Sequence, residues 1–282
     1  MKHVEIDGVE YEVLPAFERM KKALVGNTIF RFLLPRSLLL RILKASGSAL
    51  IEESMVRPGG WRSMEIIYEN SEPRNFVDRM AVRYGAFPMA IRNRKKMVNR
   101  ILHGLFDRHS RQEKLSIVSL GSGPGTHVID AMAGHDYEEI HAHCIDLDSD
   151  AFEYGEMHRE EHGLTQRVCY TEGDARSIRE HVSTPPHIVK MIGILEYLND
   201  EECVEMFRVM HEVLRPGGSL ITHGLVDRHG MDWFLRRAFN WHVTYRTGDH
   251  VVRLLREASF DHFEVNTEPM GIYPIVTAEK SG

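Results

Sequence analysis

The sequence is poor in cysteine. Its 282 residues include three cysteines, Cys144, Cys169 and Cys203, and none of them forms a CxxC pair. An odd, scattered set is not typical of a disulfide framework or of a zinc-binding motif. We therefore expect reduced thiols in the core of a cytoplasmic protein.

The sequence also has no long apolar run. The segment IFRFLLPRSLLLRIL (29–43) comes closest to a membrane span, but three arginines and a proline interrupt it, and a spanning helix needs about 20 apolar residues. The N-terminal segment lacks the apolar stretch and the cleavage site of a secretory signal peptide. We expect neither a membrane span nor a signal peptide.

Acidic residues are the minority of the charged residues in the first part of the chain, and basic residues are the minority in the second part. Residues 1–115 hold 21 Lys and Arg against 13 Asp and Glu, a net charge of +8, whereas the remainder holds 14 against 28, a net charge of −14. This shift predicts two structural units. The basic excess is diffuse and has no interleaved aromatic stacking platform, so complementary packing of the two units is favoured over nucleic-acid binding.

Strand-like and helix-like segments alternate from residue 115 onward. Apolar runs with the spacing of strands cover 115–120, 140–145, 166–173, 187–195 and 219–226, and an antiparallel pair covers 263–280. Helical patterns lie between them, so the sequence predicts an α/β fold with a doubly wound, mostly parallel sheet and helices on both faces.

The first part of the chain has a different texture. We expect a hairpin over 4–14 around Asp7-Gly8, helical segments over 16–55, an extended piece over 64–73 and two helices over 75–109. The predicted domains are a mainly helical lid or dimerisation region (1–80) and a second domain (81–282).

A glycine-rich turn follows the first strand of the second domain. It reads Gly121-Ser122-Gly123-Pro124-Gly125. Ligands of open α/β sheets bind outside the carboxyl ends of the strands, and glycines let the backbone approach a ligand closely. The GxGxG spacing differs from the GxGxxG of dinucleotide sites, and a purely structural turn is the alternative.

Acids follow the next two strands. Asp146, with Asp148 as the second choice, is placed to accept hydrogen bonds from a ribose diol on the neighbouring turn. After the third strand, the Asp174 carboxylate and the Ala175 N–H suit an adenine ring. A helix cap is the alternative for Asp174.

These motifs together resemble the class I S-adenosylmethionine-dependent methyltransferases over about residues 80–282. The matching stretches are GSGPG, IDLDSDA, GDAR, GILEYLND and LRPGGSLI. The resemblance implies a seven-stranded sheet whose last strand is antiparallel, and S-adenosyl-L-methionine as cofactor. The residues it implies as cofactor-binding are Gly121, Ser122, Gly123, Gly125, Asp146, Leu147, Asp174, Ala175, Ile192, Gly193 and Tyr197, with Glu196 beside the pocket.

Two positions depart from that family's pattern. Ser119 stands where many relatives have an acid that contacts the amino group of the cofactor, and His187 stands where an acid often precedes the fourth strand. We expect that amino group to be held by Ser119 as a weaker acceptor, by backbone carbonyls or by the N-terminal region.

No (D/N)PP(Y/F) sequence follows the fourth strand and no cysteine preceded by proline follows a strand, which argues against nucleobase acceptors. GILEYLND instead resembles the loop of relatives that act on small molecules, so the resemblance implies a small-molecule acceptor. Methylation of RNA or protein, and a non-catalytic member that only binds the cofactor, are the alternatives. A homodimer is an open possibility.

Residues 226–250 form a long connection that is expected to cover the acceptor. His223 and His242 are candidates for a general base, and Tyr84 for a lid contact; a structural or solvated histidine is the alternative. Arg237 and Arg246 are candidates for an anionic substrate group, with surface salt bridges as the alternative. The His141-Ala142-His143 pair lacks a third ligand, so no metal site is predicted.

Overall fold

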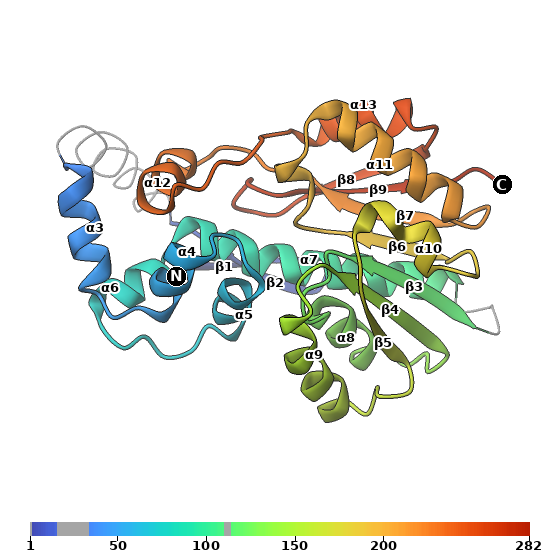
Figure 1. Ribbon diagram of the computed structural model, residues 1–282, viewed down its shortest axis with the longest axis horizontal. Coiled ribbons are helices and arrows are strands. Elements are labelled where there is room, and N and C mark those ends of the chain that lie inside the picture. The colour runs from blue at the N-terminus through green and yellow to red at the C-terminus, as the bar shows by residue number, and fades with distance from the viewer. Residues whose placement is uncertain (1, 16–33, 110–113) are drawn as a thin grey trace. The chain divides into compact units, whose positions relative to one another are not determined.

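The computed structural model describes residues 2–15, 34–109 and 114–282 (Figure 1). The chain forms two compact units. The first, which we call the helical unit, comprises Met1–Lys96, Val226–Tyr245 and Thr267–Tyr273, and the second, the sheet unit, comprises Met97–Leu225, Arg246–Asn266 and Pro274–Gly282. No helix in the described ranges is long and apolar enough to cross a membrane.

The sheet has seven strands, as predicted. They are β3 (Leu115–Leu120), β4 (Ile140–Asp146), β5 (Val168–Glu172), β6 (Ile188–Met191), β7 (Ser219–His223), β8 (Asp261–Thr267) and β9 (Pro274–Glu279), in the spatial order β5-β4-β3-β6-β7-β9-β8. The first five are parallel to one another, and β9 pairs antiparallel with β7. The mostly parallel sheet with an antiparallel last strand is confirmed.

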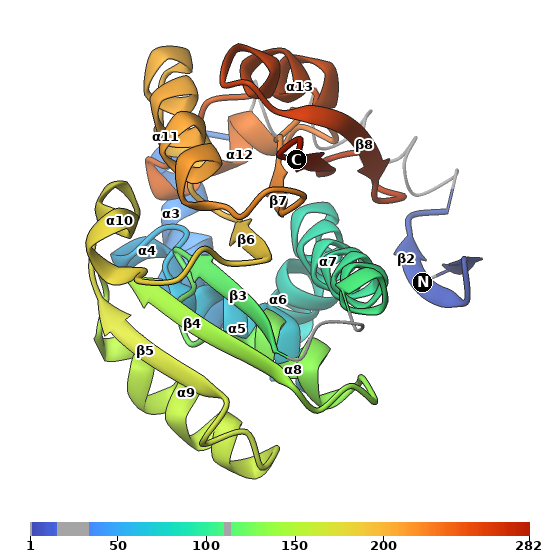
Figure 2. The ribbon, with the colours of Figure 1, turned by 90° about the vertical axis from the view of Figure 1, so that its right-hand side faces the viewer.

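Helices cover both faces of this sheet, because strands buried on two sides need two apolar layers. One layer is formed by α10 (Ile178–His181), α11 (Asp200–Val213) and α13 (Gly248–Glu257). Figures 1 and 2 show α11 and α13 together on this side, while α8 (Thr126–Ala133) and α9 (Asp150–Glu161) lie on the other. The core of the first layer includes Val118, Leu120, Val189, Met191, Phe207, Met210, Leu254 and Leu255.

The helical unit begins with the predicted hairpin, β1 (Lys2–Ile6) and β2 (Val9–Val13). Asp7 and Gly8 both have positive φ, as the tight turn requires. The helices are α3 (Arg36–Lys44), α4 (Ala49–Val56), α5 (Trp61–Glu69), α6 (Phe76–Asp78) and α12 (Met231–Phe239). The predicted helical segment over 16–33 lies outside the described residues.

Two local expectations in this unit differ from the structure. The extended piece over 64–73 is wrong, because α5 is helical up to Glu69 and ends on Asn70 in the left-handed conformation, a common helix terminus. The first of the two helices over 75–109 is only the short α6 followed by a π-turn, Arg79–Arg83. The second is confirmed as α7 (Ala86–His109).

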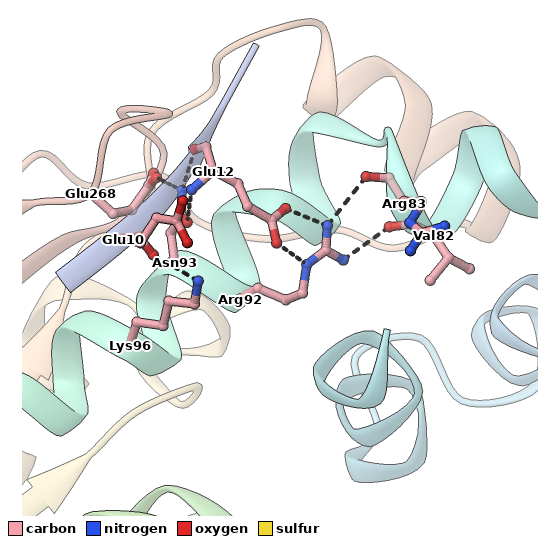
Figure 3. Close-up of polar contacts among 8 residues, drawn as sticks. All are labelled: Glu10, Glu12, Val82, Arg83, Arg92, Asn93, Lys96 and Glu268. Atoms are coloured by element: carbon pink, nitrogen blue, oxygen red, sulfur yellow. Dashed lines mark hydrogen bonds and ion pairs between the residues drawn. The ribbon is translucent and has the colours of Figure 1, made fainter. Parts of the chain in front are cut away.

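A buried polar network joins the distant segments of the helical unit (Figure 3). The Arg92 guanidinium donates to both carboxylate oxygens of Glu12, at 2.8 and 2.6 Å. Asn93 exchanges two hydrogen bonds with the backbone of Glu12 and donates to Glu268. The Glu268 carboxylate in turn accepts from three backbone N–H groups of its own loop. Burial raises the pKa of Glu268, and these N–H donors oppose that effect. The network therefore holds β2 and the 267–273 loop on α7.

Candidate cofactor-binding site

The glycine turn between β3 and α8 requires glycine for steric reasons. Gly121, Gly123 and Gly125 have φ values of 56°, 53° and 80°, in the left-handed region that other residues rarely adopt. A Cβ on Gly121 would lie 2.7 Å from Ile194 Cδ1, and one on Gly125 would lie 2.8 Å from Cys144 Sγ. The turn is therefore packed tightly against its neighbours.

Asp146 is joined directly to this turn. Its Oδ2 accepts from the Gly123 N–H at 2.6 Å, and its Oδ1 accepts from the Asp148 N–H at 2.9 Å. The contact arises because β3 and β4 are parallel and in register, with Leu120 opposite Ile145. Each carboxylate oxygen has further acceptor capacity for a ligand hydroxyl.

The exit of β5 lies at the same edge. The Gly173 N–H donates to the Asp146 carbonyl at 2.9 Å. Asp174 Oδ1 accepts from the Arg176 N–H at 2.8 Å and caps the 3₁₀ turn η3 (Ala175–Ser177), and Ala175 is buried. The capping alternative for Asp174 is thus present, and its role toward adenine stays a prediction.

The exit of β6 contributes a second backbone turn. Ile192 is buried, and Gly193 has a φ of 88°. The 3₁₀ turn η4 (Leu195–Tyr197) follows. Tyr197 is 51% exposed, and Leu147, beside Asp146, is 68% exposed. Two large apolar side chains therefore lie exposed after β4 and β6, the two strands that flank β3, where an apolar part of a ligand could cover them.

His223 is fully buried at the end of β7. Its Nδ1 lies 2.8 Å from the Gly224 carbonyl, and its Nε2 accepts from the Gly193 N–H at 2.9 Å. A carbonyl only accepts and an amide N–H only donates, so the proton belongs on Nδ1. The lone pair on Nε2, which a base would use, is therefore engaged by Gly193.

Glu196 lies beside this histidine. Its Oε2 is 3.7 Å from His223 Nε2, and the residue is 8% exposed. Within the described part of the chain, this oxygen has no hydrogen-bond partner. A buried carboxylate oxygen without a partner is unfavourable for stability, which makes it a candidate for contact with a substrate.

Arg246 does not have the role that the sequence suggested. It is buried, and its guanidinium donates to Asp200 and to the carbonyls of Leu195 and Leu198, at 2.7–2.8 Å. Burial alone would raise the pKa of Asp200, but hydrogen bonds from Arg246 and His250 lower it below its ordinary value. The guanidinium therefore fixes η4 and is not exposed to a substrate anion.

The unusual serine is explained by a buried lysine. Lys190 Nζ donates to Ser119 Oγ at 3.0 Å, and both residues are buried on adjacent strands. Beside Ser119 on the other side lies Cys144, whose pKa is raised to about 12 by burial. The sequence reasoning missed Lys190, although a lysine within the apolar run HIVKMIGIL was a visible signal.

The other departure lies at the opposite end of the strands. His187 precedes β6, and its ring contacts Ser116 and Arg215. Burial, and then the positive charge of Arg215, lower the pKa of His187 to about 4. Ligands bind at the carboxyl ends of parallel strands, so His187 does not belong to the site.

Three sequence candidates belong to the helical unit. Tyr84 ends the π-turn through its backbone N–H, which donates to the Arg79 carbonyl. His242 is exposed and lies 3.0 Å from an Arg236 Nη. Arg237 donates to the Leu34 carbonyl. The contacts of the sheet unit described above involve none of them, and the roles of Tyr84 and His242 stay predictions.

Comparisons with known proteins agree with this geometry. A family model described as "Putative methyltransferase" matches residues 63–280. No curated protein sequence matches the chain. Among solved structures, a possible exported protein from Bordetella parapertussis is similar, with 18% identity, coverage of 94% of this chain and 93% of that chain, and a TM-score of 0.73.

Two methyltransferase structures are similar as well. Magnesium protoporphyrin IX methyltransferase from Synechocystis, with bound SAH, has 11% identity, coverage of 87% and 99%, and a TM-score of 0.57. An O-methyltransferase family protein from Burkholderia thailandensis has 16% identity, coverage of 83% and 72%, and a TM-score of 0.51. At these identities the likeness shows a shared fold. The family match covers well over half of the chain, and the protein therefore belongs to this methyltransferase family.

Proposed function

We propose that this methyltransferase uses S-adenosyl-L-methionine and transfers its methyl group to a small molecule. The observation that carries the proposal is the bond from the Gly123 N–H to the Asp146 carboxylate, which joins a left-handed glycine turn to an acid at the carboxyl edge of the sheet. When bound, the cofactor supplies a methyl group already activated by its sulfonium.

The residues at this edge fit the parts of that cofactor. Asp146 can accept from a ribose diol, and the glycine backbone can follow the methionine part without side-chain hindrance. Leu147 is an exposed apolar surface for the adenine ring predicted at Asp174 and Ala175, and Tyr197 would border the cofactor from the turn after β6. Ser119 is engaged by Lys190, so we assign the amino group of the cofactor to backbone carbonyls of the turn.

We assign proton removal from the acceptor to Glu196 in preference to His223. A base is needed only where the acceptor must lose a proton, as a hydroxyl does. His223 holds Gly193 with its Nε2 lone pair, while Glu196 Oε2 is buried and close to that ring. Glu196 would take the proton of the acceptor hydroxyl as that oxygen is methylated, and the bound cofactor would supply the methyl group and a sulfur leaving group.

The remaining parts of the proposal concern partners and location. A small, ring-containing acceptor is supported by the structurally similar Synechocystis enzyme, whose substrate is a porphyrin. Residues 1–80 would act as a lid or as a dimer contact, testable by sedimentation. The three cysteines are all free, and Cys169 is exposed, contrary to the expectation that all three lie in the core. Free thiols are compatible with a cytoplasmic location, which cell fractionation would test.

The cofactor assignment is tested by titration calorimetry with S-adenosylmethionine and S-adenosylhomocysteine. Hydrogen bonds to a charged group contribute about 1.5–3 kcal/mol, so Asp146→Asn should weaken binding by about 10-fold or more. Asp148→Asn is the matched control, with an expected change under about 3-fold. If the wild type binds neither ligand, or if Asp148→Asn is the damaging variant, the assignment of Asp146 fails.

The base is tested with a panel of phenols, carboxylic acids and amines, with S-adenosylhomocysteine release as the readout. On a hydroxyl acceptor, Glu196→Gln should lower kcat by about 10²–10⁴-fold and leave cofactor affinity unchanged. His223→Asn should alter cofactor affinity as well, because it releases Gly193. Unchanged kcat in Glu196→Gln would remove Glu196 from the reaction.

A further inference from the structure

A cluster of two histidines and an aspartate lies on helices α8 and α9, apart from the groups used above. His158 and His162 are four residues apart at the end of α9, and Asp130 lies on α8. One ligand atom from each of the three lies within 4.8 Å of the others. Among the described residues, no other group of three His, Cys, Asp or Glu side chains meets this condition.

The geometry of the cluster is that of a metal-binding face. Residues four apart on a helix are neighbours on one side of it, and the rings of His158 and His162 lie with their centroids 4.7 Å apart. His158 Nε2 is 2.7 Å from Asp130 Oδ1, so the two groups already point at each other. Ligand atoms of a tetrahedral zinc ion lie about 3.3 Å apart, given bond lengths near 2.0–2.1 Å.

The surroundings favour a cation at this place. Glu161 Oε2 lies 3.9 Å from His158 Nδ1, on the side of the ring away from Asp130. At this distance the carboxylate forms an ion pair with a protonated ring and no hydrogen bond; a small side-chain movement would let it accept from Nδ1, as carboxylates behind histidine ligands do. Helix α9 also carries the exposed acids Glu153, Glu156 and Glu160. Asp130 and His158 are partly buried, whereas His162 is exposed and can turn toward an ion at little cost.

We propose that Asp130, His158 and His162 bind a divalent transition-metal ion of the zinc class, with water completing the coordination. Imidazole and carboxylate ligands suit zinc and nickel. His141 and His143 are not part of this site, since His143 is bonded to Thr171. The proposal does not depend on the methyltransferase reaction.

Such an ion would link two helices that begin next to the cofactor turns. Helix α8 starts directly after Gly125, and α9 starts at Asp150, shortly after Asp146. A ligand that binds the folded state and not the unfolded one stabilises the fold by mass action. Zinc should therefore raise the melting temperature of the wild type.

The site is tested by calorimetric titration of the tag-free full chain with Zn²⁺, and by the absorption spectrum of Co²⁺ as a substitute. We expect one ion per chain. Loss of a residue that only orients a ligand weakens metal binding by about 10–100-fold. Loss of a ligand itself should cost at least as much, so His162→Ala and His158→Ala should each weaken binding by at least about 10-fold. Glu161→Gln should weaken it less than these two.

Glu160→Gln is the matched control, because it removes an exposed acid from the same helix without touching a ligand, and it should bind like the wild type. His162 is exposed, so its variant should fold normally, and circular dichroism checks this. The proposal is overturned if no zinc binds, if His162→Ala binds as tightly as the wild type, or if the cobalt spectrum shows a thiolate band.

Discussion

Substitution of Gly125 by alanine tests whether packing beneath the turn, and not the turn alone, requires glycine. A residue with a side chain at a φ of 80° loses about 1–2 kcal/mol. The new Cβ would also lie 2.8 Å from Cys144 Sγ, a fully buried atom that has to move. Overpacking of this kind costs about 1–3 kcal/mol, so the expected loss of stability is about 2–5 kcal/mol.

Two further variants separate these two contributions. Gly163 has a φ of 67° and no atom within 4 Å of a Cβ placed there, so Gly163→Ala should lose only the conformational part, about 1–2 kcal/mol. Adding Cys144→Ala to Gly125→Ala removes the sulfur. The double variant should then be more stable than the sum of the two single losses by about 1–3 kcal/mol.

The assay is thermal and urea-induced unfolding followed by circular dichroism. For a chain of this size, 1 kcal/mol corresponds to about 2–4 °C in Tm, so Gly125→Ala should melt about 4–20 °C below the wild type. The reasoning is refuted if Gly125→Ala and Gly163→Ala are equally stable, or if the Gly125 and Cys144 losses simply add.

Two more predictions concern buried charges. Arg92→Met should destabilise the chain by about 3–5 kcal/mol in urea unfolding, because it leaves the Glu12 carboxylate buried and unpaired. As a control, Glu72→Gln removes an exposed ion pair with Arg83 and should change stability by less than about 1 kcal/mol. Burial and Arg215 keep His187 neutral down to about pH 4, whereas a histidine in the unfolded chain takes up a proton below about pH 6.5. The contribution of His187 to the free energy of unfolding should therefore be fully present above about pH 6.5 and should be lost as the pH falls toward 4. In His187→Gln this slope should be shallower in unfolding measured across that range, and an unchanged slope would contradict the explanation.

The sequence was sufficient for the sheet because its signals are local and strong. Each strand is a short apolar run, and glycines, acids or turns mark its end, so the succession of strands along the chain and the antiparallel pair at its end could be predicted. The extended piece over 64–73 failed because a short segment with apolar residues at Met64, Ile66, Ile67 and Tyr68 satisfies helical and strand spacing alike. Only packing selected the helix that ends at Asn70.

For the candidate site as well, some features could be predicted from the sequence and others could not. The glycine turn and Asp146 could be located from the sequence, because parallel strands in register bring the ends of β3 and β4 together. The group that each side chain contacts could not be predicted from the sequence, because the two partners are distant in the chain. Lys190 beside Ser119, Arg246 beneath η4 and Gly193 on the His223 ring are examples.

By itself, then, the sequence determined the fold class, and it located the glycine turn after β3 and the acid at the end of β4, since these follow from periodicity and from the position of each strand end. The tertiary structure alone decided that Glu196 is the buried carboxylate beside His223. It alone decided that segments around residues 12, 92 and 268 form one polar network, and that Asp130 meets His158. These pairings depend on how helices and loops pack across the molecule, and no local pattern in the chain encodes a contact between residues so far apart.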